Sequence, residues 1–252
     1  SRSGTASRAA AGRDSAPARA ASRVAANQPV ASRAVAGRLV ASPAVALAGP
    51  DPAGRAARAD PDGEAAVRIV GGDFRGRTLA GPKTQSIRPT SDRLRESLFN
   101  ILAHAHGDKV QGARVLDLFA GTGALGLEAV SRGAAYALFV DEGVEARGLI
   151  RRNIEELGLT GRTRLFRRDA TKLGPAGTVP PFDLVFADPP YGRGREEPAL
   201  AAALEGGWLA EDALCVLEES GAAAIEPIAG LEVIDRREAG DTQLVFLRRS
   251  AG

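Results

Sequence analysis

The sequence predicts an α/β fold whose β-sheet is mostly parallel and ends in an antiparallel pair of strands. Apolar strands alternate with helical segments through the second half of the chain, and this alternation is typical of a parallel sheet. Two late apolar segments, residues 231–235 and 243–247, flank a turn near Gly240 and should pair antiparallel. We expect three parts: residues 1–66, 67–105 and 106–252.

The first part, residues 1–66, is expected to be disordered. It is dominated by Ala, Arg, Ser, Pro and Gly, it contains no aromatic residue, and it shows no period that would bury one face. Its composition is typical of an organellar transit peptide, and equally of a high-GC coding sequence translated upstream of its true start. In the second case Val67 would mark the start.

A β-hairpin is predicted directly after the tail. Residues 68–70 and 77–79 form two short apolar-polar runs on either side of a glycine-bearing turn. Phe74 lies at the tip of this turn between charged residues, where it would either stack on an unpaired base or staple the hairpin to the body of the protein.

A helix follows the hairpin, capped by Thr90 or Ser91. Arg88 and Thr90 precede its N-terminus, which suits a phosphate. Apolar residues at helical spacing indicate its buried face, whereas Arg93 and the other charged residues should point outward. These apolar residues are Leu94, Leu98, Ile101, Leu102 and Ala105.

Positive charge is concentrated in residues 67–95. This segment has seven Lys and Arg residues against two Asp, although the whole chain has a net charge of only +2. A cluster of this kind indicates contact with a polyanion, and an ordinary solvated surface is the alternative. The expected nucleic-acid contacts are Arg68, Phe74, Arg75, Arg77, Arg88, Thr90 and Arg93, together with Tyr191.

A strand, turn and helix at residues 115–126 form the first candidate ligand site. The glycines of the turn permit a ligand to approach the backbone closely, in the manner of a dinucleotide or another adenosine cofactor. Asp117 would repel a pyrophosphate but would suit an ammonium group, so we favour S-adenosylmethionine over a nicotinamide cofactor. The candidate cofactor-binding residues here are Asp117, Phe119, Ala120, Gly121, Thr122, Gly123 and Gly126.

Two further acids follow predicted strands. Asp141 comes 20 residues after Gly121, where ribose hydroxyls require a carboxylate. Asp169, followed by Ala170, is placed to accept a hydrogen bond from an adenine amino group, or else to cap the short stretch after it. Helices are expected over residues 144–157, with Gly158 as the stop, and over residues 198–204.

The strongest candidate for a catalytic site is Asp188-Pro189-Pro190-Tyr191, at the end of the apolar strand 182–187. An acidic acceptor, a stiff backbone with outward carbonyls and a flat ring suit the exocyclic amine of a nucleobase. Asp188 would also reach the cofactor site. An ordinary strand-ending turn is the alternative interpretation.

Together, these motifs resemble the RsmD-type RNA methyltransferases over about residues 67–250. The likeness rests on residues 68–72 with 76–79, residues 88–90 with 95–102, the glycine turn and the Asp188–Tyr191 quartet. It implies a Rossmann-like class I S-adenosylmethionine-dependent methyltransferase fold, with seven strands of which one is antiparallel. In that family the second-strand acid is usually glutamate, so Asp141 is a shorter replacement.

The resemblance also implies an activity, which is methylation of the N2 amine of a guanine in 16S ribosomal RNA. The expected substrate is a partly assembled 30S particle and the expected enzyme is a monomer. Tyr191 would stack on the base while Asp188 and the Pro189 carbonyl accept hydrogen bonds from the amine. The alternatives are an adenine-N6 methyltransferase, a non-catalytic RNA-binding protein and, least favoured, a dehydrogenase.

Composition limits the remaining possibilities. No apolar run approaches the length of a membrane span, so no membrane partner is expected and a bacterial cytoplasmic location is predicted, with organellar targeting by the tail as the alternative. Cys215, the single cysteine, is expected to be a buried thiol. Because His104 and His106 stand without a cysteine cluster, no metal site is expected.

Overall fold

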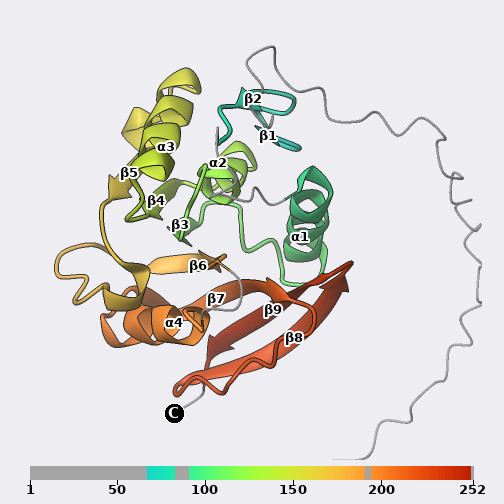
Figure 1. Cartoon of the computed structure of the whole chain (residues 1–252), viewed down its shortest axis with the longest axis vertical. Helices are drawn as coiled ribbons and strands as arrows, with labels where there is room; N and C mark the ends of the chain where they lie inside the picture. The colour runs from blue at the N-terminus through green and yellow to red at the C-terminus, as the bar shows by residue number, and fades with distance from the viewer. Residues whose placement is uncertain (1–66, 83–90, 191–193, 251–252) are drawn as a thin grey trace, which may run out of the picture. The chain divides into compact units, whose positions relative to one another are not determined.

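A seven-stranded sheet forms the centre of the protein in the computed structural model, which describes residues 67–82, 91–190 and 194–250. The strand order is β5-β4-β3-β6-β7-β9-β8, and β9 alone runs against the other six (Figure 1). The predicted fold class is therefore confirmed. The strands are β3 (Arg114–Leu118), β4 (Tyr136–Val140), β5 (Thr163–Phe166), β6 (Phe182–Ala187), β7 (Leu209–Ser220), β8 (Leu231–Ala239) and β9 (Thr242–Arg249).

The helices begin and end close to the predicted residues. Gly158, with a φ of 69° that favours glycine, follows the end of α3 as expected. The fourth helix extends slightly beyond its predicted range at both ends. The helices are α1 (Asp92–His104), α2 (Ala124–Ser131), α3 (Val144–Glu156) and α4 (Glu196–Glu205), with short 3₁₀ turns η1 (Thr160–Arg162) and η2 (Ala170–Lys172).

Strict alternation along the strands gives the sheet two apolar faces. Val115, Phe139, Phe186 and Val216 belong to one core cluster, which α1, α2 and α3 cover. The residues between them belong to a second cluster that α4 covers, and Figure 1 shows α4 on the opposite side of the sheet from α1. Cys215 lies in this second core as predicted, where burial raises the pKa of its thiol to about 12.

The predicted hairpin is present as β1 (Val67–Arg68) paired antiparallel with β2 (Thr78–Leu79). Its turn is fastened to the end of α2, because the Asp73 N–H donates to the Ser131 carbonyl at 2.8 Å and the Phe74 N–H donates to Ser131 Oγ at 2.9 Å. Phe74 is half-buried and packs against the core. These contacts favour the staple over the base-stacking alternative for Phe74.

One predicted surface cation is instead buried. Ser91 caps α1 by accepting from the Leu94 N–H at 3.2 Å, but the side chain of Arg95 is fully buried. Arg95 Nη2 lies 2.7 Å from Asp92 Oδ1 and also donates to the Arg68 carbonyl, while its Nε lies 4.0 Å from Glu128 Oε2. The expectation that Arg95 adds to a positive surface was therefore wrong, since its side chain is buried and pairs with Asp92 of the same helix and with Glu128 of α2.

The hairpin and α1 do not form a separate core. Val67, Ile69 and Leu79 of the hairpin lie in the same cluster as Leu98 of α1 and Val115 of the central strand. The segments on either side of residue 105 thus share one hydrophobic core. No helix within the described ranges is long and apolar enough to span a membrane.

Candidate active site

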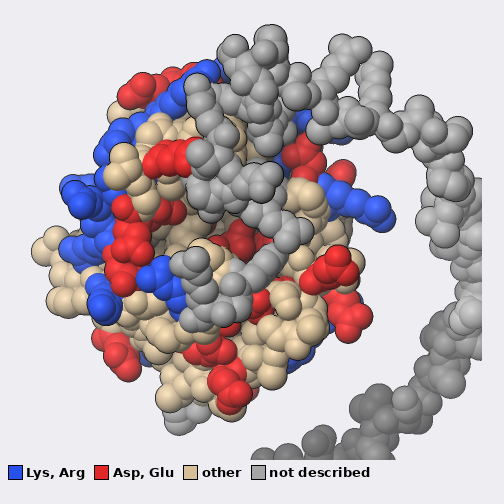
Figure 2. Space-filling model, viewed as in Figure 1, with Lys and Arg blue, Asp and Glu red and all other residues tan. Residues whose placement is uncertain are grey.

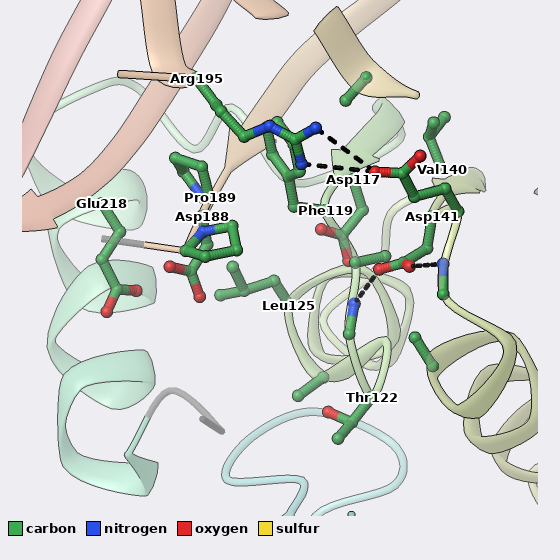
Figure 3. Close-up of a pocket in the computed structure, with 18 of the residues that line it drawn as sticks. Asp117, Phe119, Thr122, Leu125, Val140, Asp141, Asp188, Pro189, Arg195 and Glu218 are labelled. Atoms are coloured by element: carbon green, nitrogen blue, oxygen red, sulfur yellow. Dashed lines mark hydrogen bonds and ion pairs between the residues drawn. The ribbon is translucent and has the colours of Figure 1, made fainter. Parts of the chain in front are cut away.

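A cavity of about 670 Å³ opens at the carboxyl ends of the parallel strands, next to β3 and β6 (Figure 3). The strand order reverses at β3. The strands that follow it first, β4 and β5, lie on one side of β3, and the later strands β6 and β7 lie on its other side. Open α/β sheets bind ligands at such a switch point. The volume is in the range of small-molecule sites, roughly 300–1,000 Å³.

The predicted glycine turn forms one wall of the cavity. Gly123 has a φ of 79° and stands at the N-cap of α2, a conformation that side chains disfavour. A Cβ on Gly126 would lie only 2.4 Å from Phe139 Cε1, so the helix packs on β4 too closely for any other residue. Phe119 also has a positive φ, 58°, and such strain is common at ligand sites.

Asp117 lies beneath this turn at the end of β3. Its Oδ2 accepts a 2.9 Å hydrogen bond from the Gly126 N–H, and the residue is only 2% exposed. Desolvation raises the pKa of Asp117 to about 8, against the opposing effect of that hydrogen bond. A carboxyl group with such a raised pKa loses its proton and becomes negatively charged when a cation binds beside it, because the cation stabilises the carboxylate. The ammonium group of an amino-acid moiety fits that requirement.

Asp141 lies at the end of β4 and is held by two backbone groups. Its Oδ2 accepts from the Gly121 N–H at 3.0 Å and its Oδ1 from the Gly143 N–H at 2.7 Å (Figure 3). Burial raises the pKa of its carboxyl group, and the two hydrogen bonds oppose the shift. Both oxygens retain lone pairs for a ligand. The contact between Asp141 and a ribose stays a prediction. The two backbone hydrogen bonds hold the carboxylate in place before any ligand binds.

Asp169 is the N-cap of η2, in agreement with the capping alternative. Its Oδ1 accepts from the Thr171 N–H at 3.0 Å and from Thr171 Oγ1 at 2.8 Å. Its Oδ2 lies 3.9 Å from Arg195 Nη2, and Ala170 lines the cavity. A contact between Asp169 and an adenine amino group stays a prediction.

The predicted catalytic quartet lies partly within the described residues. Asp188 is half-buried and Pro189 is buried, and both line the cavity with the exposed Pro190 (Figure 3). Tyr191 lies outside the described residues, as do Arg88 and Thr90. The structure thus places the acid and both prolines beside the glycine turn, about 70 residues away in sequence.

Alternation along the strands also places the acids. Asp117, Asp141 and Asp188 each come two residues after a side chain of the core that α1, α2 and α3 cover, namely Val115, Phe139 and Phe186. Because side chains two apart share a face, all three carboxyl groups belong to the same side of the sheet.

The same rule finds a fourth acid that the sequence interpretation missed. Glu218 follows Val216 by two residues, lies at the end of β7 and lines the cavity. The sequence did contain the pattern that would have identified Glu218. An acid at the carboxyl end of an apolar strand is the same pattern that led to the other three acids.

The cavity lining includes further charged residues that sequence reasoning missed, among them Arg195 and Glu142. Arg195, the N-cap of α4, is labelled in Figure 3. Its Nη1 and Nη2 each lie 3.4 Å from Glu142 Oε1. Its Cζ also lies 6.0 Å from the Phe119 ring centroid.

An exposed apolar residue also lines the cavity. Val144 is 78% exposed, which gives the cavity an apolar surface near Asp141. No motif in the sequence singles out these positions.

The expected RNA-contacting arginines within the described residues are all exposed, but two of them are already engaged by the protein. Arg68 pairs with Asp92 at 3.1 Å and Arg77 donates to the Glu156 carbonyl. Figure 2 also shows Lys and Arg side chains gathered over α3 and β5, a basic surface that the sequence interpretation did not identify. Its exposed residues are Arg151, Arg152, Arg164, Arg167 and Arg168.

The fold and the site together define a class I S-adenosylmethionine-dependent methyltransferase. Asp117 suits the ammonium group of the cofactor, the glycine turn admits its chain, and Asp141 presents a carboxylate for its ribose. Among the described residues, no group of three or more His, Cys, Asp or Glu side chains is placed to hold a metal ion.

Comparison with known proteins narrows this class to a family. The sequence model of the family described as "Conserved hypothetical protein 95" matches residues 67–248. The chain therefore belongs to this family, the RsmD-type ribosomal RNA methyltransferases.

Individual relatives agree with the family. Ribosomal RNA small subunit methyltransferase D of Escherichia coli K12 is 41% identical over 157 residues, which are 62% of this chain and 76% of the relative. The protein of the same name from Haemophilus influenzae is 32% identical over 63% of this chain and 81% of its own length. The solved structure of yhhF from Escherichia coli has a TM-score of 0.62 and 34% identity, covering 74% of this chain and 99% of that one.

Proposed function

We propose that this protein methylates the exocyclic N2 amine of a guanine in 16S ribosomal RNA, acting as a monomer in the bacterial cytoplasm on a partly assembled 30S subunit. The observation that carries the proposal is the position of Asp188 and Pro189 on the wall of the cavity that also holds the glycine turn. The named relatives, which are small-subunit ribosomal RNA methyltransferases, support the substrate.

S-Adenosylmethionine, when bound, supplies an electrophilic methyl group on a positively charged sulfur. Asp117 would pair with its ammonium group and Asp141 would accept hydrogen bonds from its ribose hydroxyls. Gly121 and Gly123 allow the backbone to approach it closely. These residues fix one partner of the reaction at the carboxyl ends of β3 and β4.

Asp188 acts on the other partner. The amine of guanine is a poor nucleophile because its lone pair is delocalised into the ring, so alignment with the methyl group is where the rate is gained. In this proposal Asp188 and the Pro189 carbonyl accept the two N–H groups and hold the lone pair in line. The Asp188 carboxylate would stabilise positive charge as it develops on nitrogen, while the N–C bond forms and the donor's sulfur–methyl bond breaks to leave a neutral thioether. The proton on nitrogen would then pass to solvent.

The hairpin and α1 would place the RNA, as expected for residues 67–105. Arg75 and Arg93 are the exposed cations of the described part of this segment that are best placed to contact phosphates. Tyr191 would provide the stacking surface for the base. Phe74 supports the hairpin from beneath, in view of its packing against the core.

The test is transfer of labelled methyl groups to small subunits that lack the native methylation, followed by nucleoside digestion and mass spectrometry. N2-methylguanosine in the 16S RNA is the expected product. Label in N6-methyladenosine would support the adenine alternative and overturn the proposal. A protein that binds the methyl donor but labels no RNA would also contradict it.

A further inference from the structure

Glu218 and Asp188 are neighbours at the carboxyl ends of adjacent strands. The parallel pairing of β6 with β7 ends with Ala187 opposite Leu217, so the next residue of each strand is an acid. Neighbouring strands lie about 4.8 Å apart. Both side chains line the cavity, and Figure 3 shows their carboxyl groups directed to the same side.

Glu218 is placed where the fold alone would favour an apolar residue. It is 6% exposed, it follows the core residue Val216 on the same face, and its partner across β9 is the buried Leu244. Removing a carboxylate from water is unfavourable unless hydrogen bonds compensate for the lost hydration. A carboxylate offers about four lone-pair positions, so it can accept from a ligand in addition to partners within the protein.

The cavity extends beyond Asp188 on the side of Glu218. Thr242, at the start of β9, lines the cavity and pairs with Ser220 of β7, and Ser91, the N-cap of α1, and Leu94 of α1 also belong to the lining. The residues suited to the cofactor lie at the other end, at the carboxyl ends of β3 and β4. The end that holds Glu218 is therefore available for the target base, with Asp188 between the base and the cofactor.

We propose that Glu218 accepts a hydrogen bond from N1–H of the target guanine, next to the N2 amine that Asp188 accepts. The Watson–Crick edge of guanine presents these two donors side by side, and two adjacent carboxylates are acceptors only, so they match it. Glu218 is thus a specificity-determining residue. This inference rests on the proposed function and deepens it.

The pair would also reject adenine. N1 of adenine is an acceptor, so its lone pair would face the Glu218 carboxylate with no hydrogen between them. A site built to receive a donor discriminates strongly against an analogue that lacks it, by up to about 10⁴-fold. The acidic pair therefore gives a physical reason for guanine over adenine that a single acid beside two prolines does not give.

The test compares guanosine with 2-aminopurine riboside at the methylated position of reconstituted small subunits. 2-Aminopurine keeps the N2 amine but has no hydrogen on N1. Under single-turnover conditions, wild-type protein should methylate guanosine at least about 100-fold faster. In Glu218→Gln the amide can turn its NH₂ toward N1, so this ratio should fall at least about tenfold, with the donor Kd unchanged.

Glu219→Gln is the matched control. Glu219 is the next residue of β7 and is also buried, but it alternates to the other face and does not line the cavity. It should keep both the rate and the preference for guanosine. An unchanged ratio in Glu218→Gln would overturn the inference while the proposed function stands.

The wild-type protein alone provides a second readout, in case Glu218→Gln does not fold. Equal rates on guanosine and 2-aminopurine would overturn the role of Glu218. By contrast, the absence of N2-methylguanosine from native small subunits would overturn the proposed function itself. The two failures are therefore distinguishable.

Discussion

Asp117 and Gly126 are joined by a 2.9 Å hydrogen bond from the glycine N–H to the buried carboxyl group, which ties the end of β3 to the first turns of α2. The same glycine packs directly on Phe139 of β4. One residue therefore sets both the spacing between helix and sheet and the position of the acid.

Gly126→Ala should destabilise the protein by about 1–3 kcal/mol, because its Cβ would lie 2.4 Å from Phe139 Cε1 and force the core to shift. Gly148→Ala is the control, since Gly148 is an exposed residue within α3 with no atom near the added Cβ. It should stabilise the protein by about 0.5–1 kcal/mol. Urea unfolding measures both, and equal effects would contradict the packing argument.

Affinity for S-adenosylmethionine should rise with pH between 6 and 8. The pKa of Asp117 is raised to about 8, so its carboxyl group is mostly protonated in the free protein below that pH. Pairing with the ammonium group needs the carboxylate, so binding releases a proton and affinity increases up to about tenfold per pH unit. Calorimetry in buffers of different ionisation enthalpy would detect that proton, and Asp117→Asn should abolish it.

Asp117 should make the free energy of unfolding fall as pH rises, whereas it makes the affinity for S-adenosylmethionine increase. As pH rises from about 4 to about 8, the unfolded chain ionises Asp117 while the folded protein keeps its proton. A raised carboxyl pKa thus contributes stability at low pH that is lost toward the folded pKa. The free energy of unfolding should fall less steeply over this range in Asp117→Asn. Parallel slopes for variant and wild type would exclude the shift.

Asp188→Ala should lose at least about 10²-fold in kcat while the Kd for S-adenosylmethionine changes less than about threefold. The reason is that a fixed acceptor for the amine acts mainly on the transition state. Single-turnover methyl transfer and calorimetry separate the two quantities. Asp188→Asn, which keeps the shape but removes the charge, should retain donor affinity and still lose most of the rate. Normal turnover in either variant would exclude the proposed role.

The double variant Arg75→Ala/Arg93→Ala should bind the RNA substrate more weakly. Both arginines are exposed and would neutralise phosphates, so the slope of log affinity against log salt should become shallower by about 2. Lys109→Ala is the control, because Lys109 pairs with Asp212 near the amino ends of the parallel strands, away from the cavity. Filter binding across a salt series measures both, and similar slopes would count against RNA contact at the hairpin.

Glu128→Gln should destabilise the protein by about 3–5 kcal/mol, the usual effect of removing one partner from a buried ionic group. Glu128 is fully buried, and it accepts from the Val70 N–H at 2.8 Å and from Arg132 Nε at 2.7 Å. Glu156→Gln breaks only an exposed pair with Arg152 and should change stability by less than about 0.5 kcal/mol. Thermal and urea unfolding would show whether this difference is real.

Much of this architecture follows from local sequence. The strands are short apolar runs, Ser91 is a good cap, and Gly158 is a good stop, so these elements were predicted from neighbouring residues. The acids at 117, 141 and 188 were found because each follows an apolar strand at a distinct motif. Their common face follows from alternation, once the sheet is known to be parallel.

The remaining features depend on partners that are distant in sequence. Arg95 was expected on the surface because only its own helix was considered, whereas Glu128 of α2 and the Arg68 carbonyl surround it in the fold. Glu218 was missed because β7 carries no recognisable motif. Its importance became visible only when the pairing with β6 placed it beside Asp188.

The placement of four acids on one face by the two-residue period makes the site sensitive to chain length. Deleting one residue from β3, β4, β6 or β7 would shift the register and turn the terminal acid toward α4. Substitutions can therefore adjust this enzyme gradually, but insertions and deletions in these strands would remove a functional group in one step. Length variation in related sequences should be confined to the loops at the amino ends of the strands and to the sheet edge formed by β8.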